Sequence, residues 1–378
     1  MPIYVDYAAA TPVDPQVLAA MQPYYEQEFY NPSATYLAAK TVASKLAEAR
    51  ATVAHWLGAR PSEIIFTAGG TEANNLAIDG IMGQFADGHL VISSIEHESV
   101  LGPAQQYDYH AVAVQPDGTI DLAALQAAIT DKTVLVSVMY ANNEIGTIQP
   151  LADIARLLQN IREVRRKQNN DRPLYFHTDA CQAANYLDLH VARLGADLMT
   201  LNGGKIYGPK QSGVLYVSAH VQLQPQILGG GQERNLRSGT ENVAQSVGLA
   251  TALGLAQSQR QAEAKRLQQL QQLCIQQLEQ IVPSVVINGS RKKRLPNNVH
   301  LTIPGVDNER LLMQLDEVGI MAAAGSACSA SDEEPSHVLR AIGLDDAAAQ
   351  ASLRVTFGRQ TSQRNIEQVV TAIRRFVS

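Results

Sequence analysis

Short apolar runs alternate with helical patterns over the first two thirds of the chain. The first run, Glu63–Thr67, reads EIIFT and is followed by a Gly-Gly turn and a helical segment. Further runs are HLVISS, YHAVAV, TVLVSVMYA, PLYFHTD, DLMTL and GVLYV, and helix-like stretches such as LADIARLLQNIREVRRK separate several of them. Buried strands between helices favour an α/β fold with a mostly parallel sheet.

Polar residues and glycines come at or just after the ends of several of these runs. They include Gly70, Thr71, Asn143, Asp179 and Lys205. Ligands of open α/β sheets bind beyond the carboxyl ends of the strands. We therefore expect these residues to lie near one rim of the sheet, where they could share a ligand.

The last third of the chain has a different organisation. A proline-free segment from about Thr240 to Ile281 carries apolar residues at helical spacing, which predicts a long amphipathic helix that links two domains. A dimerising coiled coil is the weaker alternative, because no charge pattern flanks the apolar stripe. The later runs VVIN, NVHLTI and SLRVTF indicate a smaller α+β domain. We predict a large domain over residues 13–255 and a small domain over residues 1–12 and 256–378.

The composition excludes several classes of protein. Hydrophobic residues make up 46% of the 378 residues and charged residues 17%, which is a globular balance. The net charge of -6 gives no reason to expect a nucleic acid or an anionic membrane as the main partner. No apolar run is long enough to span a bilayer, and the N-terminus lacks a secretory pattern. Three cysteines, Cys181, Cys274 and Cys328, do not make a disulfide framework and fit a reducing cytoplasm, the compartment that we expect.

The segment LNGGKIYGPK, residues 201–210, raises the question of what Lys205 does. A phosphate loop of the Walker type is excluded, because Met199 stands where the motif needs its first glycine and Ile206 where it needs serine or threonine. A turn with a solvated lysine remains open. The other alternative is a lysine at a strand end that forms an imine with an aldehyde cofactor.

Other strand ends offer chemistry that suits such a cofactor, although each has a structural alternative. The segment TAGGTEANN opens a helix, and its backbone N–H groups with the Thr71 hydroxyl suit a phosphate. Asp179 could pair with a pyridinium nitrogen, or it could simply cap a helix. His97 in IEHES could face a cofactor ring, or it could be structural. A phosphate cradle, a ring-facing histidine, a pyridine-pairing acid and an imine lysine, in that order, suggest pyridoxal phosphate.

At this point the sequence resembles the cysteine desulfurases of the NifS/IscS type. The similarity covers nearly the whole chain, and its motifs are YVDYAAATPVDP, FYNPSA, TAGGTEANNLAI, EHES, NNEIGTIQP, HTDACQ, KIYGPK, GGGQERNLRSGTENV, RLPNNVHL, GSACSASDEEPSHVLRAIG and SLRVTFGR. The resemblance implies the α/β fold of the fold-type-I pyridoxal phosphate transferases, with a mostly parallel seven-stranded sheet in the large domain. It also implies pyridoxal 5'-phosphate as cofactor, with no metal at the active site.

The resemblance also implies a role for each site residue. Lys205 would hold the cofactor and move the Cα proton of the substrate, and His97 would stack on the ring and shuttle protons. Arg354 would grip the carboxylate of L-cysteine, and Asn143 would also bind the substrate. The remaining cofactor-binding residues would be Gly70 and Thr71 at the phosphate, Asp179 at the ring nitrogen, and Gln182 and Asn143 at the phenolic oxygen. Thr240 would reach the phosphate in the neighbouring subunit of a homodimer.

Cys328 carries the sulfur in this interpretation. It lies in AAAGSACSASDEEPSH, a stretch of small and polar residues with little to bury. Its thiolate would attack the sulfur of bound cysteine, leaving alanine and a persulfide that passes to an acceptor protein, either an iron–sulfur scaffold or a tRNA-thiolation protein. Cys181 and Cys274 suit structural positions better.

The chain departs from the family pattern next to the imine lysine. The family usually has Ser-Gly-His-Lys where this sequence has Asn202, Gly203, Gly204 and Lys205. We expect Asn202 and the partner's Thr240 to hold the phosphate where the histidine is missing. Two alternatives remain: a selenocysteine lyase or other pyridoxal phosphate lyase, which would not need Cys328, and a non-catalytic homologue that serves as a binding partner.

Overall fold

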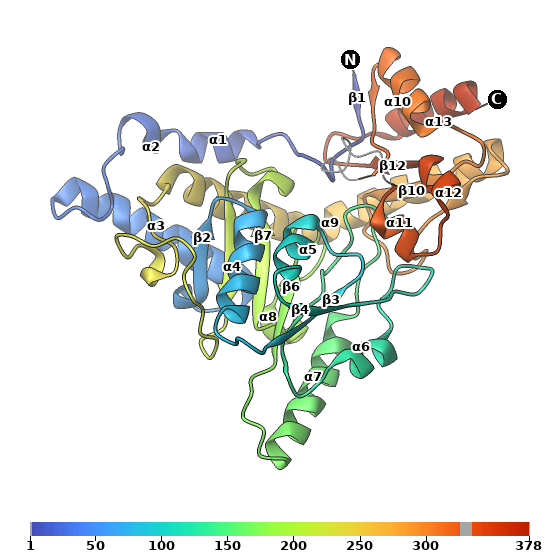
Figure 1. Ribbon diagram of the computed structural model, residues 1–378. Coiled ribbons are helices and arrows are strands. Elements are labelled where there is room, and N and C mark those ends of the chain that lie inside the picture. The colour runs from blue at the N-terminus through green and yellow to red at the C-terminus, as the bar shows by residue number, and fades with distance from the viewer. Residues whose placement is uncertain (1, 326–334, 378) are drawn as a thin grey trace.

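The computed structural model describes residues 2–325 and 335–377 (Figure 1). Its centre is a seven-stranded sheet with the strand order β2-β8-β7-β6-β5-β3-β4. Strand β8 runs antiparallel to both of its neighbours, and the pairings among β3, β4, β5, β6 and β7 are parallel. The strands are β2 (Ile64–Thr67), β3 (His89–Ser93), β4 (Asp108–Val112), β5 (Thr133–Ser137), β6 (Tyr175–Asp179), β7 (Leu198–Asn202) and β8 (Gly213–Val217). All seven apolar runs of the first two thirds therefore form strands of one mostly parallel sheet, as predicted.

Helices cover both faces of this sheet, because neighbouring strand residues point to opposite sides. On one face, Ile65 and Leu90 pack against α4 and α5; on the other, Ile64 and Val91 lie in a core with α3, α7 and part of α9. Every residue of β3 and β5 is buried, which explains their continuous apolar sequences. The helices of this part are α1 (Pro15–Met21), α2 (Pro23–Glu26), α3 (Leu37–Leu57), α4 (Gly70–Met82), α5 (Glu98–Ala104), α6 (Leu122–Ala128), α7 (Leu151–Lys167) and α8 (Val191–Leu194).

The run TVLVSVMYA leaves the sheet earlier than its sequence suggests. Strand β5 ends at Ser137, and two residues on, the N–H of Met139 donates to the carboxyl oxygen Oε1 of Glu96 at 2.7 Å. Glu96 is fully buried, and burial raises the pKa of its carboxyl well above the ordinary value. The N–H groups of Val138 and Tyr140 still donate to the carbonyls of His177 and Asp179, at 3.1 Å and 2.8 Å, so the segment stays beside β6 as it runs toward the ligand rim.

A second, smaller core surrounds an antiparallel sheet with the strand order β12-β10-β9, next to the parallel pair β1 and β11. The elements here are β1 (Ile3–Tyr4), β9 (Val286–Ile287), β10 (Asn298–Thr302), α10 (Asn308–Glu317), β11 (Ile320–Met321), α11 (His337–Ala341), α12 (Asp346–Gln350), β12 (Ser352–Thr356) and α13 (Gln363–Val377). Because β1 pairs with β11, the first residues of the chain belong to this second core. The division into two domains at the boundaries given above stays a prediction.

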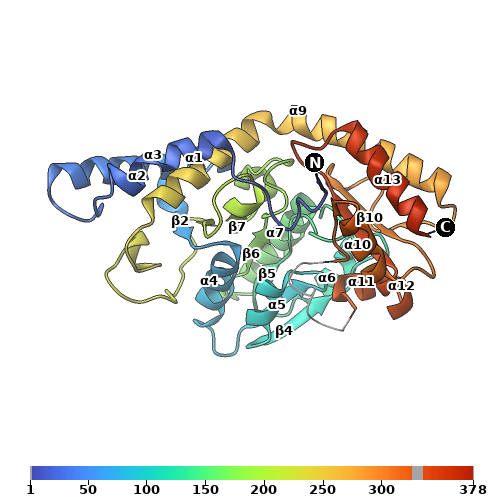
Figure 2. The ribbon, with the colours of Figure 1, turned by 90° about the horizontal axis from the view of Figure 1, so that it is seen from above.

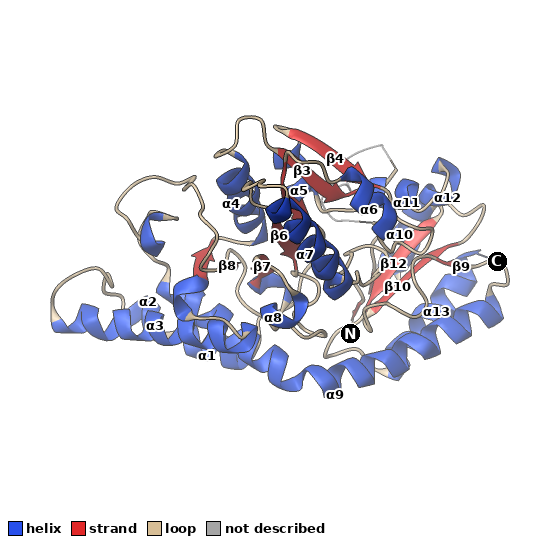
Figure 3. Cartoon of the chain, turned by 90° about the horizontal axis from the view of Figure 1, so that it is seen from below, coloured by secondary structure: helices blue, strands red, loops and turns tan. Residues whose placement is uncertain are grey.

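The long helix expected near residues 240–281 is α9 (Val243–Ile281). It contacts α1 and α3 along one part and α13 along another, as Figures 2 and 3 show. Cys274 lies on its apolar stripe and is fully buried, and burial raises the pKa of this thiol to about 12. This thiol therefore packs as an apolar side chain. Within the described ranges, no helix combines the length and the apolar character that crossing a membrane requires.

Candidate active site

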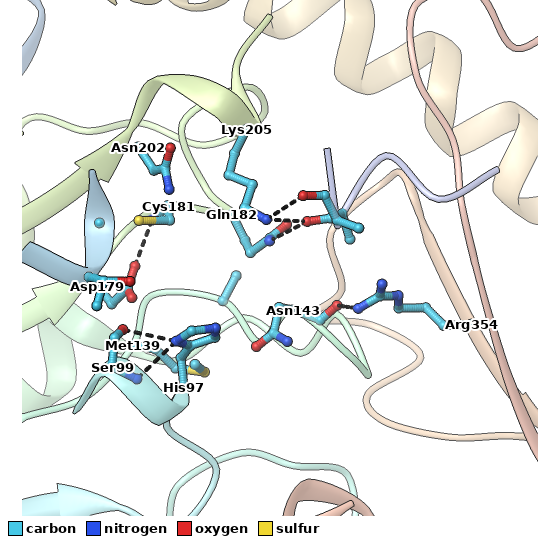
Figure 4. Close-up of a pocket in the computed structure, with 15 residues that line it drawn as sticks. His97, Ser99, Met139, Asn143, Asp179, Cys181, Gln182, Asn202, Lys205 and Arg354 are labelled. Atoms are coloured by element: carbon cyan, nitrogen blue, oxygen red, sulfur yellow. Dashed lines mark hydrogen bonds between the residues drawn. The ribbon is translucent and has the colours of Figure 1, made fainter. Parts of the chain in front are cut away.

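A pocket lies at the rim of the large sheet, where the ends of β6 and β7 and the start of α4 meet the N-terminal segment and β12 (Figure 4). Most of the predicted site residues line it: Gly70, Thr71, His97, Asn143, Asp179, Gln182, Asn202, Lys205 and Arg354. A wider opening adjoins the pocket and shares several of its walls. Residues far apart in the sequence thus converge on one site, as the strand-end argument requires.

The start of α4 forms one end of the pocket. Gly69 precedes the helix with φ of 155°, a conformation that favours glycine, and no side chain of the described residues caps the helix. The first N–H groups of an α-helix have no partner within the helix, so they remain available to an anion. At Gly70 a Cβ would lie only 2.9 Å from Cys181 Sγ, so glycine is the residue that fits at this helix start without displacing Cys181.

Asn202 faces the same helix end. Its oxygen Oδ1 accepts the N–H of Gly204 at 2.9 Å, which turns its amide nitrogen Nδ2 to within 3.4 Å of the Cβ position of Gly70. Its amide nitrogen can therefore donate to the same anion as the helix. Gly204 contributes no side chain, and the nearest described atom to a Cβ built there is Asn202 Oδ1 at 3.4 Å.

Lys205 ends a short 3-10 turn, Gly203–Lys205, directly after β7. Its amine Nζ donates to the carbonyl oxygens of Ala8 at 3.0 Å and Ala9 at 2.6 Å. The side-chain amide of Gln182 donates to the same Ala8 carbonyl at 3.0 Å. The N-terminal segment therefore positions both side chains on one wall of the pocket, and the solvated-turn alternative for Lys205 is excluded.

Asp179 ends β6 and is 8% exposed. Its two carboxylate oxygens have different partners: Oδ1 accepts the N–H of Cys181 at 2.9 Å, and Oδ2 accepts the side-chain amide of Asn74 at 2.8 Å. The capping alternative is thus partly correct, although the capped segment is a turn rather than a helix. A charge fixed this firmly can pair with a cation in the pocket.

Cys181 lines the pocket rather than a closed core, which the sequence did not indicate. Burial, and then the nearby charge of Asp179, raises the pKa of the Cys181 thiol well above its ordinary value. The thiol therefore stays protonated, and it is unsuited to act as a nucleophile.

His97 precedes α5 and caps it. Its ring nitrogen Nδ1 accepts the backbone N–H of Ser99 at 3.1 Å and lies 2.9 Å from the Ser99 hydroxyl. Figure 4 shows the other ring nitrogen on the side of the ring that faces the pocket. His97 therefore has the structural role of a helix cap, and its ring also lines the pocket.

Arg354 reaches the opposite side of the pocket from β12 and is 1% exposed. Its guanidinium forms an ion pair with Asp6 at 2.7 Å and donates to the Asn143 carbonyl at 3.0 Å, and its Nε has no partner among the described atoms. Asn142, buried behind it, accepts the N–H groups of Glu144 and Ile145, which fixes the loop that carries Asn143. These contacts hold a planar, charged donor at the pocket wall.

One predicted residue does not line this pocket, and another lies outside the described residues. Thr240 is exposed and does not line the pocket of its own chain. Cys328 lies in residues 326–334, outside the described residues.

The sequence argument missed several residues of the site. Asn74 and Ser99 connect His97 to Asp179, and Asp6 balances the charge of Arg354. A signal for Asn74 was present, because it shares the apolar face of α4 with Ala77, three positions on, and is itself fully buried. The contribution of Asp6 depends on a contact across 348 positions, which no local pattern reports.

Comparisons with known proteins agree with this geometry. The family model for class-V aminotransferases matches residues 3–369. The cysteine desulfurase IscS of Dictyoglomus turgidum is 37% identical over 382 residues, covering 99% of this chain and 94% of its own. The cysteine desulfurase of Homo sapiens is 40% identical over 379 residues, covering 98% and 80% respectively.

Solved structures give the same result. A NifS-like protein from Rickettsia africae superposes with a TM-score of 0.89 at 30% identity, covering 100% of this chain and 99% of that one. The protein SspA, solved in complex with cysteine, has a TM-score of 0.80 at 35% identity, with 94% and 98% covered. The chain therefore belongs to the class-V aminotransferase family, whose members use pyridoxal phosphate. Among its relatives in that family are cysteine desulfurases from bacteria and mammals.

The residues of the pocket fit this cofactor. The uncapped start of α4 and the Asn202 amide suit a phosphate, the Asp179 carboxylate suits a ring nitrogen, and the Lys205 amine suits an aldehyde. The absence of a side chain at Gly70 leaves room at the same helix start.

Proposed function

We propose that this protein is a cysteine desulfurase that uses pyridoxal 5'-phosphate to convert L-cysteine to L-alanine and transfers the sulfur, through a persulfide on Cys328, to an acceptor. The observation that carries the proposal is the convergence on one pocket of an uncapped helix start, Asp179, Lys205 and Arg354. Full-length similarity to cysteine desulfurases supports the same reaction.

Groups from several elements of the fold would hold the cofactor. The N–H groups of Gly70 and Thr71 with the Asn202 amide would bind its phosphate, and Asp179 would pair with its ring nitrogen. Lys205 would bind its aldehyde carbon, and His97 would stack on its ring. When bound, the cofactor supplies an electron sink that stabilises negative charge on the substrate carbons.

The substrate would lie between the cofactor and β12. Arg354 and Asn143 would bind the carboxylate of L-cysteine, and a guanidinium can do so with two parallel hydrogen bonds. Because Asp6 already balances part of the charge on Arg354, the buried cation is stable before substrate arrives. The Lys205 amine would then take the Cα proton and return a proton to the substrate.

Cys328 would accept the sulfur. Its thiolate attacks the substrate sulfur, the S–S bond forms as the Cβ–S bond breaks, and the bonding electron pair stays with the substrate carbon. Protonation of that carbon gives alanine. The acceptor would be an iron–sulfur scaffold protein or a tRNA-thiolation protein.

The functional unit would be a homodimer. Thr240 is exposed on its own chain, as expected for a residue that completes the phosphate site of a second copy. Phe29, Tyr36 and Leu37 are 66%, 52% and 81% exposed, an apolar surface that a second copy would cover. Sedimentation should show a dimer, and Thr240→Ala should weaken cofactor binding while the protein remains a dimer. A monomer with full cofactor affinity would contradict this arrangement.

The reaction is tested with purified, cofactor-loaded protein and L-cysteine. We expect alanine in proportion to sulfur released, and mass spectrometry should find one added sulfur on Cys328. Lys205→Ala should lose both the visible absorbance of the bound cofactor and the activity. A selenocysteine lyase would retain full activity in Cys328→Ala, and a non-catalytic homologue would stay colourless after incubation with the cofactor; either result would overturn the proposal.

A further inference from the structure

We infer that Asn74 and Ser99 are positioning residues that hold His97 in one tautomer, with its proton on Nε2, toward the pocket. The three side chains and Asp179 form one continuous hydrogen-bonded series. Its distances are 2.9 Å from His97 Nδ1 to Ser99 Oγ, 2.8 Å from Ser99 Oγ to Asn74 Nδ2, and 2.8 Å from Asn74 Nδ2 to Asp179 Oδ2. The inference deepens the proposed function, because it concerns how that site uses His97.

The backbone determines the first contact. The N–H of Ser99 points at His97 Nδ1 from 3.1 Å, and a backbone N–H can only donate. A proton on Nδ1 would face that N–H directly and leave it without an acceptor. Nδ1 must therefore be the unprotonated nitrogen, and the neutral ring carries its proton on Nε2.

The side chains add a second donor to the same nitrogen. The Asn74 amide nitrogen has two hydrogens and two acceptors within reach, Asp179 Oδ2 and Ser99 Oγ. Because Ser99 Oγ accepts from Asn74, its own hydrogen is directed to His97 Nδ1. The negative charge of Asp179 thus sets the direction of every donor in the series.

The orientation of Asn74 is costly, which indicates that it is constrained. Asn74 is fully buried, and its oxygen Oδ1 has no hydrogen-bond partner among the described atoms. A buried carbonyl without a partner destabilises a fold. The amide keeps this orientation because reversing it would place Oδ1 against the Asp179 carboxylate.

The chemical consequence concerns what His97 can do. Nδ1 accepts from the backbone N–H and the hydroxyl of Ser99, so Nε2 is the nitrogen that carries a hydrogen toward the pocket. A neutral ring with its proton on Nε2 donates a hydrogen bond to a group in the pocket, but it does not transfer that proton. His97 therefore serves as a fixed hydrogen-bond donor, and proton transfer at the substrate is left to Lys205.

The tautomer can be read directly by 15N and 13C NMR of histidine-labelled protein at about pH 8, above the ordinary histidine pKa of about 6.5. The signals of His97 are identified by their loss in His97→Gln. We expect Nε2 protonated and Nδ1 unprotonated and hydrogen-bonded. In Ser99→Ala the Nδ1 resonance should shift toward that of an imidazole nitrogen that accepts fewer hydrogen bonds, and Ser99→Thr should restore it.

A matched control lies five residues away. The hydroxyl of Ser94 is buried without a partner among the described atoms, so Ser94→Ala should leave the His97 signals unchanged. In cofactor-loaded protein, Ser99→Ala should lower kcat for L-cysteine about tenfold with KM unchanged, the effect of one weakened hydrogen bond. A proton on Nδ1 in the unmutated protein, or an unmoved Nδ1 resonance in Ser99→Ala, would overturn the inference. Neither NMR outcome depends on whether the protein proves to be a desulfurase. The position of the proton in the unmutated protein is measured without any Ser99 variant, so it does not depend on such a variant folding.

Discussion

Replacing Gly204 by histidine should tighten the binding of pyridoxal phosphate. A Cβ at this position meets Asn202 Oδ1 at 3.4 Å and Lys210 Cγ at 3.7 Å, which are ordinary contacts, and the backbone there does not need glycine. Position 204 also borders the opening that Gly70 and Thr71 share with the pocket. An imidazole that donates to a phosphate oxygen would contribute about 1.5–3 kcal/mol, which lowers Kd roughly ten- to hundredfold.

The assay is equilibrium dialysis of cofactor-free protein against pyridoxal phosphate, followed by visible absorbance. Gly204→Ala is the control, because it adds the Cβ alone and should leave Kd within about twofold. If Gly204→His binds no more tightly than Gly204→Ala, position 204 does not face the phosphate, and the assignment of this end of the pocket is wrong.

Three further predictions follow from the structure. Burial lowers the pKa of His177 to about 4, so between about pH 6.5 and pH 4 this ring takes up a proton in the unfolded chain but not in the folded one. The contribution of neutral His177 to the free energy of unfolding is therefore fully present above about pH 6.5 and is lost as the pH falls toward 4. The free energy of unfolding in urea should fall by about 2 kcal/mol more between pH 7 and pH 5 in the unmutated protein than in His177→Gln. Arg354→Lys should raise KM for L-cysteine about tenfold while the cofactor absorbance stays, because lysine cannot bind a carboxylate with two parallel hydrogen bonds; an unchanged KM would exclude Arg354 from substrate binding. Cys328→Ala should abolish alanine formation and Cys181→Ala should retain most of it, since burial keeps the Cys181 thiol protonated.

The large sheet could be predicted from the sequence because its strands, apart from the exposed edge strand β4, are buried on both faces. A strand such as β3 has no polar face, so its apolar run is unbroken and stands out between helical patterns. The end of β5 before Met139 could not be predicted, because the N–H of Met139 pairs with the buried carboxyl of Glu96, 43 positions earlier. Strand periodicity reports which face a residue occupies, not where its hydrogen bonds go.

The site was predictable where one residue carries the chemistry. Lys205 and Asp179 follow strands directly, and sheet topology places such residues at one rim. Asn74 and Ser99 act only through contacts with other side chains, and those contacts exist only in the folded chain. The sequence therefore indicated which side chains would do chemistry more clearly than those that orient them.

The ion pair between Asp6 and Arg354 has a consequence for the order in which the site is assembled. The proposed cofactor-binding residues of the pocket wall lie between Gly70 and Lys205, whereas the substrate wall joins two residues 348 positions apart. A chain leaving the ribosome can thus form its own share of the cofactor site before Arg354 is synthesised. During synthesis, the nascent protein could acquire its cofactor while it is still unable to bind cysteine. The cofactor would then be in place before the chain can present a substrate to it.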